Sequence, residues 1–402
     1  MTDQTSRPVL NVRALPSSRE VVAYKDGGLF PLVVQARDGL IVALLRGGAG
    51  HLGIEGRLEV IRSTDGGHTW SPPAVVADSA RDDRDPAFGI SNAGTLVVSY
   101  MSDGSYDAAG NYRPVRNGPD VYAPIEVMIT RSHDNGLTWE KPYPRGVAPL
   151  RANSHFGKIV ALPDDTLLVP TYCAPRPEIL GERMNEARPE GTCSYLARSR
   201  DDGRTWGEPS LLAVNKNETT LLVLPGGDVL AVMRGDDDDH ALWSARSGDG
   251  GRTWSQAVQV TGRRQHPADL TLLSNGNVLL TYGNRTPPYR IEGRISRDGG
   301  RSWLDLLLTF SGHLYGYTVE AERPTDLGYP STAVTRGPGG GQGVTVYYYN
   351  PSMRRRPRAE PTDEGRLYPR DDEPFYLARD YYAIAVTWSE SELLEAVASR
   401  AR

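Results

Sequence analysis

The sequence predicts an all-β protein, a six-bladed β-propeller of four-stranded antiparallel blades with a short C-terminal helix. Three observations lead to this prediction. One eight-residue motif occurs five times, starting at residues 63, 132, 199, 247 and 296, so that the copies begin 48 to 69 residues apart. The same order of strands and turns precedes each copy. A period near 50 residues in strand-rich sequence is typical of propeller blades built from four strands.

The repeated motif has the pattern S-x-D-x-G-x-[ST]-W, which we call the Asp-box. Its aspartate is suited to accept hydrogen bonds from turn amides, and its glycine to adopt a positive φ. Its tryptophan carries enough apolar area to pack one repeat against the next. We therefore interpret the motif as structural and not as an active site. The five copies are Ser63 to Trp70, Ser132 to Trp139, Ser199 to Trp206, Ser247 to Trp254 and Ser296 to Trp303.

Each Asp-box follows apolar, β-branched segments that are separated by Gly, Asp or Asn turns, and such segments are strand signals. In the fourth repeat the strands begin near Glu218 and continue at 229–233 and 241–246. The fifth repeat has the same order, with strands at 269–273, 278–282 and 293–296. Three strands before each box, with one after it, account for a four-stranded blade.

A sixth unit keeps this order of strands but has no Asp-box. Its strands are expected at 329–334, 343–348 and 381–388. A capping box, Ser389 to Glu392, then opens a helix over 389–398. The missing fourth strand is expected from the N-terminal segment, either 9–13 or 20–24, which would close the ring. We therefore expect one domain over residues 1–402.

The composition argues against a nucleic-acid or membrane partner. The chain carries 50 acidic residues against 45 Lys and Arg, a formal net charge of −5. No apolar run resembles a signal peptide or a membrane span, so we expect a cytoplasmic protein. Cys173 and Cys193 are expected to be reduced thiols, and their spacing suits no zinc site. The acidic run 236–240 fits a solvated loop better than a calcium site, and no metal or cofactor is expected.

A propeller gathers its functional residues at the channel mouth, on the face opposite the Asp-box turns. The entries to the first strands, and the ends of the second strands, should therefore supply the site. The side chains at these positions are unusually polar or aromatic. By blade, they are Phe30, Arg46 and His51; Asp83, Arg84 and Asp85; His155 and Lys158; Glu218 and Arg234; His266, Asp269 and Arg285; and Tyr329 and Asn350.

The chain resembles the sialidase superfamily, whose members are six-bladed Asp-box propellers, over essentially its whole length. The segment Asn217 to Arg234 is similar to the sialidase segment that carries a glutamate and one arginine of a carboxylate-binding triad. The segment Asp326 to Ser331 is similar to the one that carries a nucleophilic tyrosine. The resemblance implies a carbohydrate substrate, with Tyr329 as nucleophile, Glu218 as its proton acceptor and Arg234 as an anion-binding residue. A tyrosine of pKa about 10 needs such a neighbouring base at neutral pH.

The chain also departs from the sialidase pattern. Sialidases begin blade one with Arg-Ile-Pro, whereas the matching residues here are Leu29, Phe30 and Pro31. The acidic Asp that precedes the first box in sialidases is absent from the loop 48–57, which contains His51. The third arginine of the triad remains open among Arg285, Arg290 and Arg294. We expect the substrate to be a terminal acidic or deoxy sugar other than sialic acid.

Several functions and residue roles remain open at this stage. For the acid/base role we consider His51 and an aspartate of the segment 82–85, Asp85 above all, which has a strand-capping role as its alternative. Arg46, Arg84, His155 and His266 are candidates for substrate binding, with hydrogen-bonded structural roles as the alternative for the two histidines. A retaining glycoside hydrolase is our first interpretation. A carbohydrate lyase that uses His and Tyr, and a sugar-binding propeller without activity, are the two others.

Overall fold

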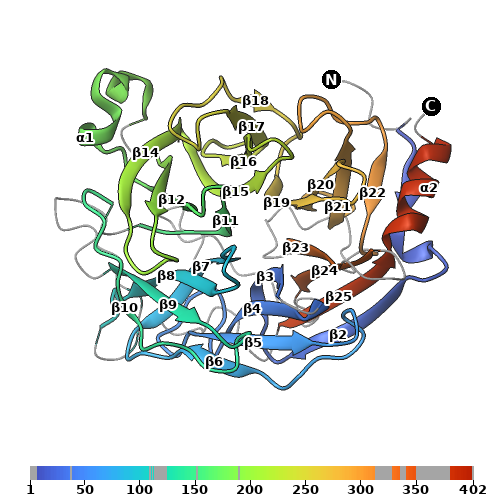
Figure 1. The fold of residues 1–402 in the computed structure, drawn as a ribbon, viewed down its shortest axis with the longest axis horizontal. Helices are drawn as coiled ribbons and strands as arrows, with labels where there is room; N and C mark the ends of the chain where they lie inside the picture. Colours follow the sequence, from blue (N-terminus) through green and yellow to red (C-terminus); the bar gives the residue numbers. More distant parts are fainter. Residues whose placement is uncertain are drawn as a thin grey trace, which may run out of the picture.

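The computed structural model describes residues 7–36, 39–107, 110, 112, 125–150, 153–188, 191–312, 328–335, 341–349 and 381–400. Almost all of its regular structure is β-strand, arranged as small, mainly antiparallel sheets around a common centre (Figure 1). This confirms the all-β class and a propeller-like arrangement. Asn350 and the basic run 354–358 lie outside the described residues.

Three of the sheets have four antiparallel strands each. The first contains β3 (Leu29–Gln35), β4 (Ile41–Gly47), β5 (Arg57–Ser63) and β6 (Ala74–Ala77). The second contains β15 (Lys216–Val223), β16 (Val229–Gly235), β17 (Leu242–Ser247) and β18 (Val258–Gln259). The third contains β23 (Gly328–Thr335), β24 (Gln342–Tyr349), β25 (Tyr382–Ser389) and, at its outer edge, β2 (Arg19–Lys25).

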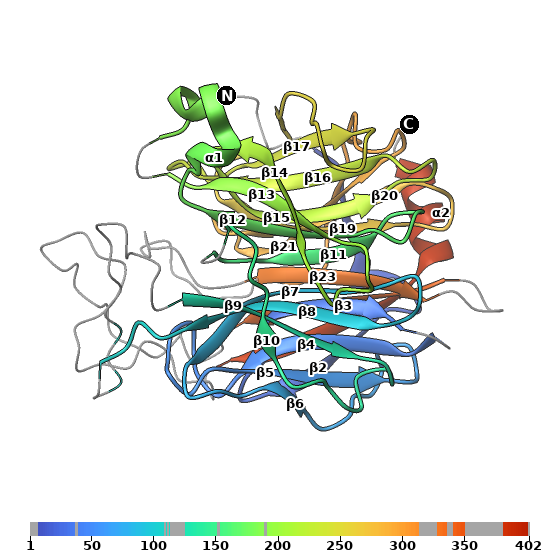
Figure 2. The same cartoon turned by 60° about the vertical axis from the view of Figure 1, so that its left-hand side comes forward.

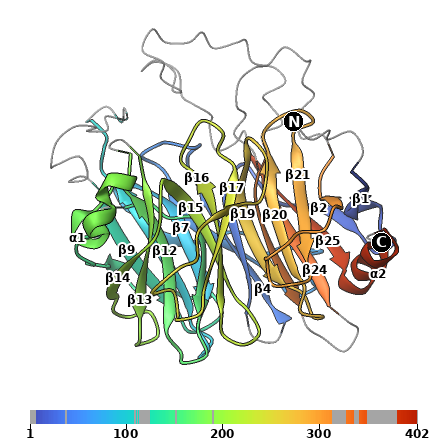
Figure 3. The same cartoon turned by 90° about the horizontal axis from the view of Figure 1, so that it is seen from above.

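The last of these sheets joins the two ends of the chain. β2 pairs antiparallel with β25, with Val21 opposite Ala385. The other N-terminal segment, β1 (Val9–Asn11), runs parallel to β22 (Leu307–Thr309) in a neighbouring sheet. The helix α2 (Glu390–Arg400) follows β25 directly and lies on the same side of the molecule as β1 and β2 (Figure 3).

Two sheets differ from the four-stranded pattern. One has five strands, because β1 extends the set β22, β21 (Arg290–Ser296), β20 (Val278–Asn284) and β19 (Gln265–Leu272). The other has eight strands in the order β10-β9-β8-β7-β11-β12-β13-β14. Their bounds are β7 (Asp82–Ile90), β8 (Leu96–Asp103), β9 (Ile125–Ser132), β10 (Tyr143–Pro144), β11 (Gly157–Ala161), β12 (Leu167–Cys173), β13 (Cys193–Ser199) and β14 (Gly207–Val214).

The eight-stranded sheet consists of two antiparallel halves that are joined by a parallel pairing of β7 with β11. Gly89 permits this close approach, because a Cβ atom there would collide with the carbonyl oxygen of Ile159. After β12 the chain forms α1 (Pro177–Leu180) and the 3-10 turn η4 (Gly181–Glu186), which lie at the periphery (Figures 1 and 2). A second 3-10 turn, η2 (Val12–Ala14), follows β1.

The first strand of each antiparallel set lies nearest the centre of the molecule (Figure 1). Within the described residues these strands form a closed cycle of contacts, in which β3 meets β7, β7 meets β11, and so on through β15, β19 and β23 back to β3. Residues at the entry to these strands therefore lie close together although they are far apart in the sequence.

The apolar core is divided among the interfaces between neighbouring sheets. One cluster, for example, combines Val33 and Ile61 of the first sheet with Val344 and Ala385 of the sheet closed by β2. The Asp-box turns fasten these interfaces. Gly67 has φ +93°, and a Cβ atom there would lie 2.8 Å from Val344 of the neighbouring sheet.

The first Asp-box has the hydrogen bonds that the sequence predicts. Asp65 accepts the backbone N–H of Thr69 at 2.9 Å and its hydroxyl at 2.5 Å, while Ser63 accepts the N–H of Gly67. Trp70 packs against the core cluster between the two sheets. Ser132, Ser199, Ser247 and Ser296 repeat the bond to the box glycine in the other four copies.

Candidate active site

Proline residues break the strand pairing where four of the innermost strands begin. Proline has no backbone N–H to donate, so it interrupts the ladder and releases the preceding residue from regular alternation. The pairing register shifts at each of these points, in β3, β7, β19 and β23. The released residues are Phe30, Asp85, His266 and Tyr329, each followed by proline. In β15 a register shift without proline surrounds Glu218.

The central feature of the site is a chain of three polar side chains. The hydroxyl of Tyr329 donates to Oε1 of Glu218 at 2.5 Å, and Nη1 of Arg234 donates to Oε2 of the same carboxylate at 3.0 Å. Tyr329 and Glu218 are each only 6% exposed, whereas the side chain of Arg234 is 20% exposed. These residues come from β23, β15 and the end of β16. The arrangement holds a phenol against a carboxylate that a cation neutralises.

The environment keeps Tyr329 in its protonated form. Burial, and after it the charge of Glu218, raise the pKa of Tyr329 well above its ordinary value, although Arg285 and Arg234 act in the opposite direction. Tyr329 also has a φ of +46°, a conformation that is uncommon for a residue with a side chain. Strained backbone of this kind is typical of functional sites.

Aromatic rings surround Tyr329. The ring centroids of Phe30 and Phe156 lie 4.7 Å and 4.6 Å from that of Tyr329, both edge to face. Tyr348 is stacked on it at 5.7 Å. His51 lies on the outer side of Phe30, with ring centroids 5.1 Å apart. Phe30 is thus part of an apolar wall between His51 and Tyr329, and Leu29, the residue that matches the sialidase arginine, is fully buried beside it.

Of the three arginines that the sequence left open, Arg285 is the one beside Tyr329. Its guanidinium carbon lies 5.3 Å from the centroid of the Tyr329 ring. Arg290 instead pairs with Glu292 at 2.8 Å, and Arg294 donates to the carbonyl oxygen of Val260 at 2.7 Å. The cations near the Tyr329 hydroxyl are therefore Arg234 and Arg285.

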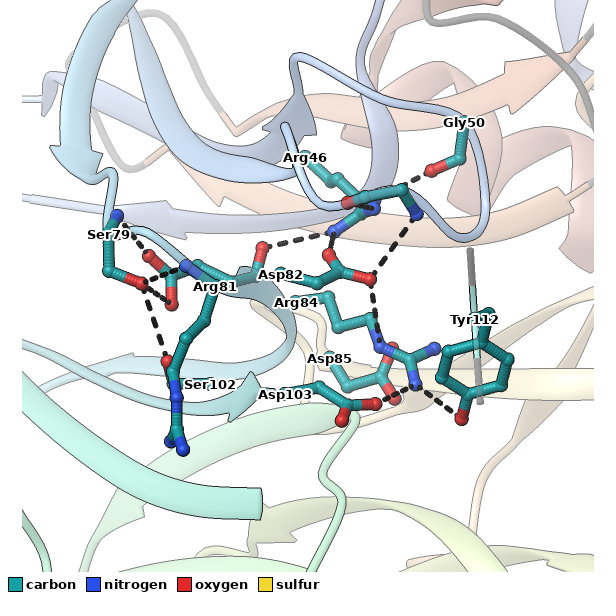
Figure 4. A network of polar contacts seen from close by, with 12 residues as sticks. Arg46, Gly50, Ser79, Arg81, Asp82, Arg84, Asp85, Ser102, Asp103 and Tyr112 are labelled. Carbon is teal, nitrogen blue, oxygen red and sulfur yellow. Dashed lines mark hydrogen bonds and ion pairs between the residues drawn. The ribbon is translucent and has the colours of Figure 1, made fainter. Parts of the chain in front are cut away.

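A buried ionic network lies beneath the His51 loop (Figure 4). Arg46 is fully buried and donates to Asp82 at 2.5 Å and to the carbonyl oxygen of Gly50 at 2.7 Å. Arg84 lies on the other side of Asp82, at 3.4 Å, and donates to Asp103 at 2.8 Å. The sequence suggested substrate-binding roles for Arg46 and Arg84. In the structure their guanidinium groups instead pair with Asp82 and Asp103. They position the loop that carries His51.

Asp85 and His155 lie together on the β7 side of the site. Asp85 is partly exposed, has a φ of +49° and accepts the hydroxyl of Ser154 at 2.7 Å. His155 is completely buried, and its Nε2 lies 2.9 Å from Nη1 of Arg145. Burial, and then the charge of Arg145, lower the pKa of His155 well below its ordinary value. His155 is therefore a neutral buried residue without access to a ligand.

His266 lies at the entry to β19, on the side of Arg234. It is 1% exposed, and its ring centroid is 5.4 Å from that of His240. Among the described residues neither of its ring nitrogens has a hydrogen-bond partner. Lys158 and Asp269, also proposed from the strand positions, instead form an ion pair of 2.9 Å at the centre of the ring.

Two residues near the site were missed by the sequence interpretation. Tyr172 lies near the end of β12, which is the second strand of its set. The ends of second strands supplied candidates in other blades, but the sequence interpretation did not consider this one. Burial, and then the charges of Asp85 and Glu218, raise its pKa. Arg264 directly precedes β19, next to the residues that we considered. Its backbone N–H donates to the carbonyl oxygen of Asp239, and its carbonyl oxygen accepts the N–H of Arg285.

The described residues contain no group of three or more His, Cys, Asp or Glu side chains placed to hold a metal ion. No helix in the described part of the chain is long and apolar enough to cross a bilayer. Cys173 and Cys193 face each other on β12 and β13 as buried free thiols.

Comparison with known proteins finds similarity to sialidases in sequence and in fold. The chain is 24% identical to a sialidase of Bacteroides fragilis over 287 residues, 64% of this chain and 50% of that protein. It spans only half the length of that relative. Among solved structures, a protein of unknown function from Dyadobacter fermentans superposes with a TM-score of 0.67 at 21% identity, over 93% of this chain and 99% of the other. A Trypanosoma rangeli sialidase in complex with the inhibitor DANA gives a TM-score of 0.61 at 15% identity, over 96% and 62%.

The fold is similar to that of sialidases of solved structure. The model of the BNR repeat-like domain matches residues 59–342, which is most of the chain. The protein therefore belongs to the BNR repeat-like domain family.

Proposed function

We propose that this protein is a retaining exo-glycoside hydrolase that removes a terminal acidic or deoxy sugar from a carbohydrate substrate. The observation that carries the proposal is the hydrogen-bonded chain from Tyr329 through Glu218 to Arg234. A buried tyrosine that donates to a carboxylate has the geometry of an activated nucleophile and its base. The sialidase-like fold supports the same class of chemistry, although fold alone does not determine it.

In the proposed first step the Tyr329 oxygen attacks the anomeric carbon while its proton passes to Oε1 of Glu218. The glycosidic bond breaks, and the departing oxygen receives a proton from an acid. Water then attacks the anomeric carbon of the glycosyl-tyrosine, and the phenol recovers its proton from Glu218. Arg234 stabilises the Glu218 carboxylate between turnovers, and Arg285 lies over the ring that carries the developing phenolate charge.

We propose His51 as the acid that protonates the leaving group and later activates water. Its ring lies against Phe30, which itself contacts Tyr329. The loop that carries it is held by Arg46 through the carbonyl oxygen of Gly50. Asp85 is the second candidate, since it is partly exposed. Asp82 and Asp83 are fully buried, and both already accept hydrogen bonds from other residues of the chain, Asp82 from Arg46 and Asp83 from Ser79.

Phe30 supports a substrate different from sialic acid. Its ring is 2% exposed and packed on Tyr329, and the preceding Leu29, which matches the sialidase arginine, is an apolar, fully buried residue. A sugar with a hydrogen or a methyl group at that point, as in a deoxy sugar, fits this wall better than a carboxylate does.

We also propose that the chain forms a six-bladed ring within a single domain. The eight-stranded sheet supplies two four-stranded blades at its parallel junction, and β2 completes the blade formed by β23, β24 and β25. The closed cycle of contacts between the innermost strands supports this count.

The function is tested with a panel of aryl glycosides of acidic and deoxy sugars, together with activated 2-fluoro glycosides that trap glycosyl-enzymes. Turnover with retention of configuration, and a mass adduct on Tyr329, are the expected results. An adduct on another residue would contradict the proposed nucleophile. Sugar binding without any turnover would favour a binding protein instead.

A lyase is the second candidate, because His51 and Tyr329 flank the same aromatic residue and can act as base and acid. A lyase leaves an unsaturated product that absorbs ultraviolet light, whereas a hydrolase product does not. Uronic-acid oligosaccharides assayed by absorbance separate the two reactions.

A further inference from the structure

A groove lies between β14 and the outer part of the sheet that contains β17. Its volume is about 900 Å³, within the range of roughly 300–1,000 Å³ that small-molecule sites occupy. Leu211 of β14 lines one side, and Trp243 of β17 and Trp254 line the other. Ile179 of α1, which packs on β14, completes the lining (Figure 1). The lining residues include neither Tyr329 nor its hydrogen-bonded partners, so the groove is separate from the candidate active site.

The two tryptophans give the groove an apolar surface. Trp243 and Trp254 are both partly exposed, whereas Trp206, at the same Asp-box position as Trp254, is only 9% exposed. The Nε1–H of Trp254 donates to the carbonyl oxygen of Gly251, and Nε1 of Trp243 is buried. The rings therefore present carbon surface to the groove. Sugar rings pack their C–H groups on such surface, because the face of an aromatic ring is negative.

Lys216 adds a buried cation to this surface. Its Nζ lies 4.5 Å from the centroid of the Trp243 ring, and the residue is only 9% exposed. Among the described residues its ammonium group donates only to the carbonyl oxygen of the adjacent Asn215, at 3.2 Å, and it forms no ion pair. Burial lowers the pKa of Lys216, and the charge of Asp237 acts in the opposite direction. A buried lysine usually has an anionic partner, so its remaining N–H groups are suited to an anionic ligand.

The other basic residues of the groove are already paired. Arg183 forms an ion pair of 2.9 Å with Glu186, and Arg252 lies 3.7 Å from Glu208. Lys216 is therefore the cation that a ligand can neutralise. A cation beside aromatic carbon surface matches a sugar that carries a carboxylate or a sulfate ester, because the sugar ring and the anion each find a partner.

The edge of β14 is less suited to an extended peptide. A peptide that adds to a sheet needs a continuous row of backbone N–H and C=O groups. Pro209 has no N–H, and the carbonyl oxygen of Glu208 accepts Nη1 of Arg198 at 2.7 Å. Ser210 donates to the carbonyl oxygen of Gly251 at 3.2 Å, which joins this part of β14 to the fourth Asp-box. These contacts favour a glycan over a peptide.

We propose that the groove between β14 and β17 is a second carbohydrate-binding site, which takes an oligosaccharide that carries carboxylate or sulfate groups. The sugar rings pack on Trp243 and Trp254, and one anionic group pairs with Lys216. The site goes beyond the proposed glycosidase function, because binding here needs no turnover and none of the residues around Tyr329. It gives the protein a hold on an acidic polysaccharide that is separate from the candidate active site.

The first test compares Lys216→Met, which removes the charge and keeps an unbranched side chain, with Lys141→Met. Lys141 is an exposed lysine outside the groove. Calorimetry measures the binding of trigalacturonic acid, κ-neocarratetraose disulfate, neutral cellotetraose and tetraglutamate. We expect wild-type protein and Lys141→Met to bind the two acidic sugars alike, and Lys216→Met to bind them at least tenfold more weakly. Lys216→Arg should recover much of the loss, and the binding of cellotetraose should not change.

Gln256→Glu gives a second test that does not depend on the folding of Lys216→Met. Gln256 is exposed and lines the groove, so the added charge should weaken the binding of both acidic sugars at least threefold. Gln259→Glu is the matched control, since this exposed residue is not part of the lining. Thermal unfolding of each variant shows whether it is folded as the wild-type protein is.

The probes also separate the sources of the anion. Tighter binding of trigalacturonic acid indicates a carboxylate, tighter binding of the carrageenan tetrasaccharide indicates a sulfate ester, and either result supports the site. Equal binding of the acidic sugars by the groove variants and their controls, or no binding by the wild-type protein, would overturn it. Tetraglutamate bound as tightly as the sugars would also overturn it, in favour of a peptide. Because Tyr329→Phe should bind the acidic sugars as the wild-type protein does, failure of the proposed chemistry and failure of this site are distinguishable.

Discussion

The hydroxyl group of Tyr329 donates a 2.5 Å hydrogen bond to Oε1 of Glu218, although the two residues are 111 positions apart. The contact exists because register shifts in β23 and β15 turn both side chains toward the same point. Such bulges re-aim side chains without disturbing the remainder of a sheet. The geometry of the proposed site therefore follows from irregularities in an otherwise regular ring of strands.

Replacing Tyr329 by phenylalanine should reduce turnover by several orders of magnitude while leaving the fold intact. The change removes only the hydroxyl, and with it the covalent step. Steady-state kinetics on the substrate found in the panel would measure the loss. Tyr347→Phe is the matched control, because this buried tyrosine belongs to a different core cluster. Near wild-type turnover by Tyr329→Phe would exclude the nucleophile and favour the His-dependent lyase.

The protein should hydrolyse standard aryl sialosides poorly. Leu29 matches the arginine that makes a charge-assisted clamp on the sialic acid carboxylate in sialidases, and one such interaction contributes roughly 1.5–3 kcal/mol, a factor of about 10 to 150. Fluorogenic sialoside hydrolysis, compared with the acidic and deoxy glycosides of the panel, tests this expectation. Release of sialic acid as fast as the best substrate would contradict it.

The architecture could be predicted from the sequence because its sequence signals are local and repeated. Each Asp-box carries its turn chemistry within eight residues, as the hydrogen bonds of Asp65 and Ser63 show. The X-Pro pairs at Phe30, Asp85, His266 and Tyr329 are equally local, and they could have identified the equivalent entry positions directly. The extra pairing of β1 with β22 has no such signal, since it joins two short edge strands from distant parts of the chain.

The roles of individual polar residues were much harder to predict from the sequence. Arg46 and Arg234 both end second strands, yet Arg46 is fully buried on Asp82 while Arg234 is partly exposed beside Glu218. The difference depends on the neighbouring blade, because Asp82 approaches Arg46 from β7. Residue type and position in a strand do not encode that contact. Arg264 was missed for the same reason.

Replacing Arg46 by methionine should destabilise the protein by about 3–5 kcal/mol, because it leaves Asp82 as a buried carboxylate without its closest cation. Denaturant unfolding measures the change. Arg183→Met is the control, since Arg183 forms an exposed pair with Glu186 and should contribute less than about 1 kcal/mol. The same stability for both variants would show that the network is not important for folding.

Cys173 and Cys193 should resist modification in the folded protein. Both side chains are buried, and burial raises the pKa of Cys173 to about 11, so little thiolate forms at neutral pH. An aromatic disulfide reagent should therefore detect no thiol in the native protein and two thiols after denaturation. Absence of thiols in denaturant without reductant would instead indicate a disulfide across β12 and β13.

Stability should fall in acid because of the Asp-boxes. Burial would raise the pKa of Asp65, but hydrogen bonds from Thr69, Ser63 and His68 outweigh it and lower the value to about 2. Asp134 and Asp298 are lowered to about 2 in the same way. Since the folded pKa lies below the unfolded value of about 3.9, the stabilisation is complete above pH 4 and is lost as the pH falls toward 2.

Unfolding measured between pH 7 and pH 2 tests this pH dependence. Asp65→Asn should lower stability at pH 7 and make its decline below pH 4 shallower, because one linked proton is removed. Asp305→Asn is the control, since Asp305 is 80% exposed and, among the described residues, forms its ion pair with the partly exposed Arg7. If Asp65→Asn keeps the acid dependence of the wild-type protein, the carboxylate of this box does not contribute to acid unfolding. The loss of stability in acid would then have to arise from buried groups such as the pair of Arg46 and Asp82. Variants of that pair would separate the two sources.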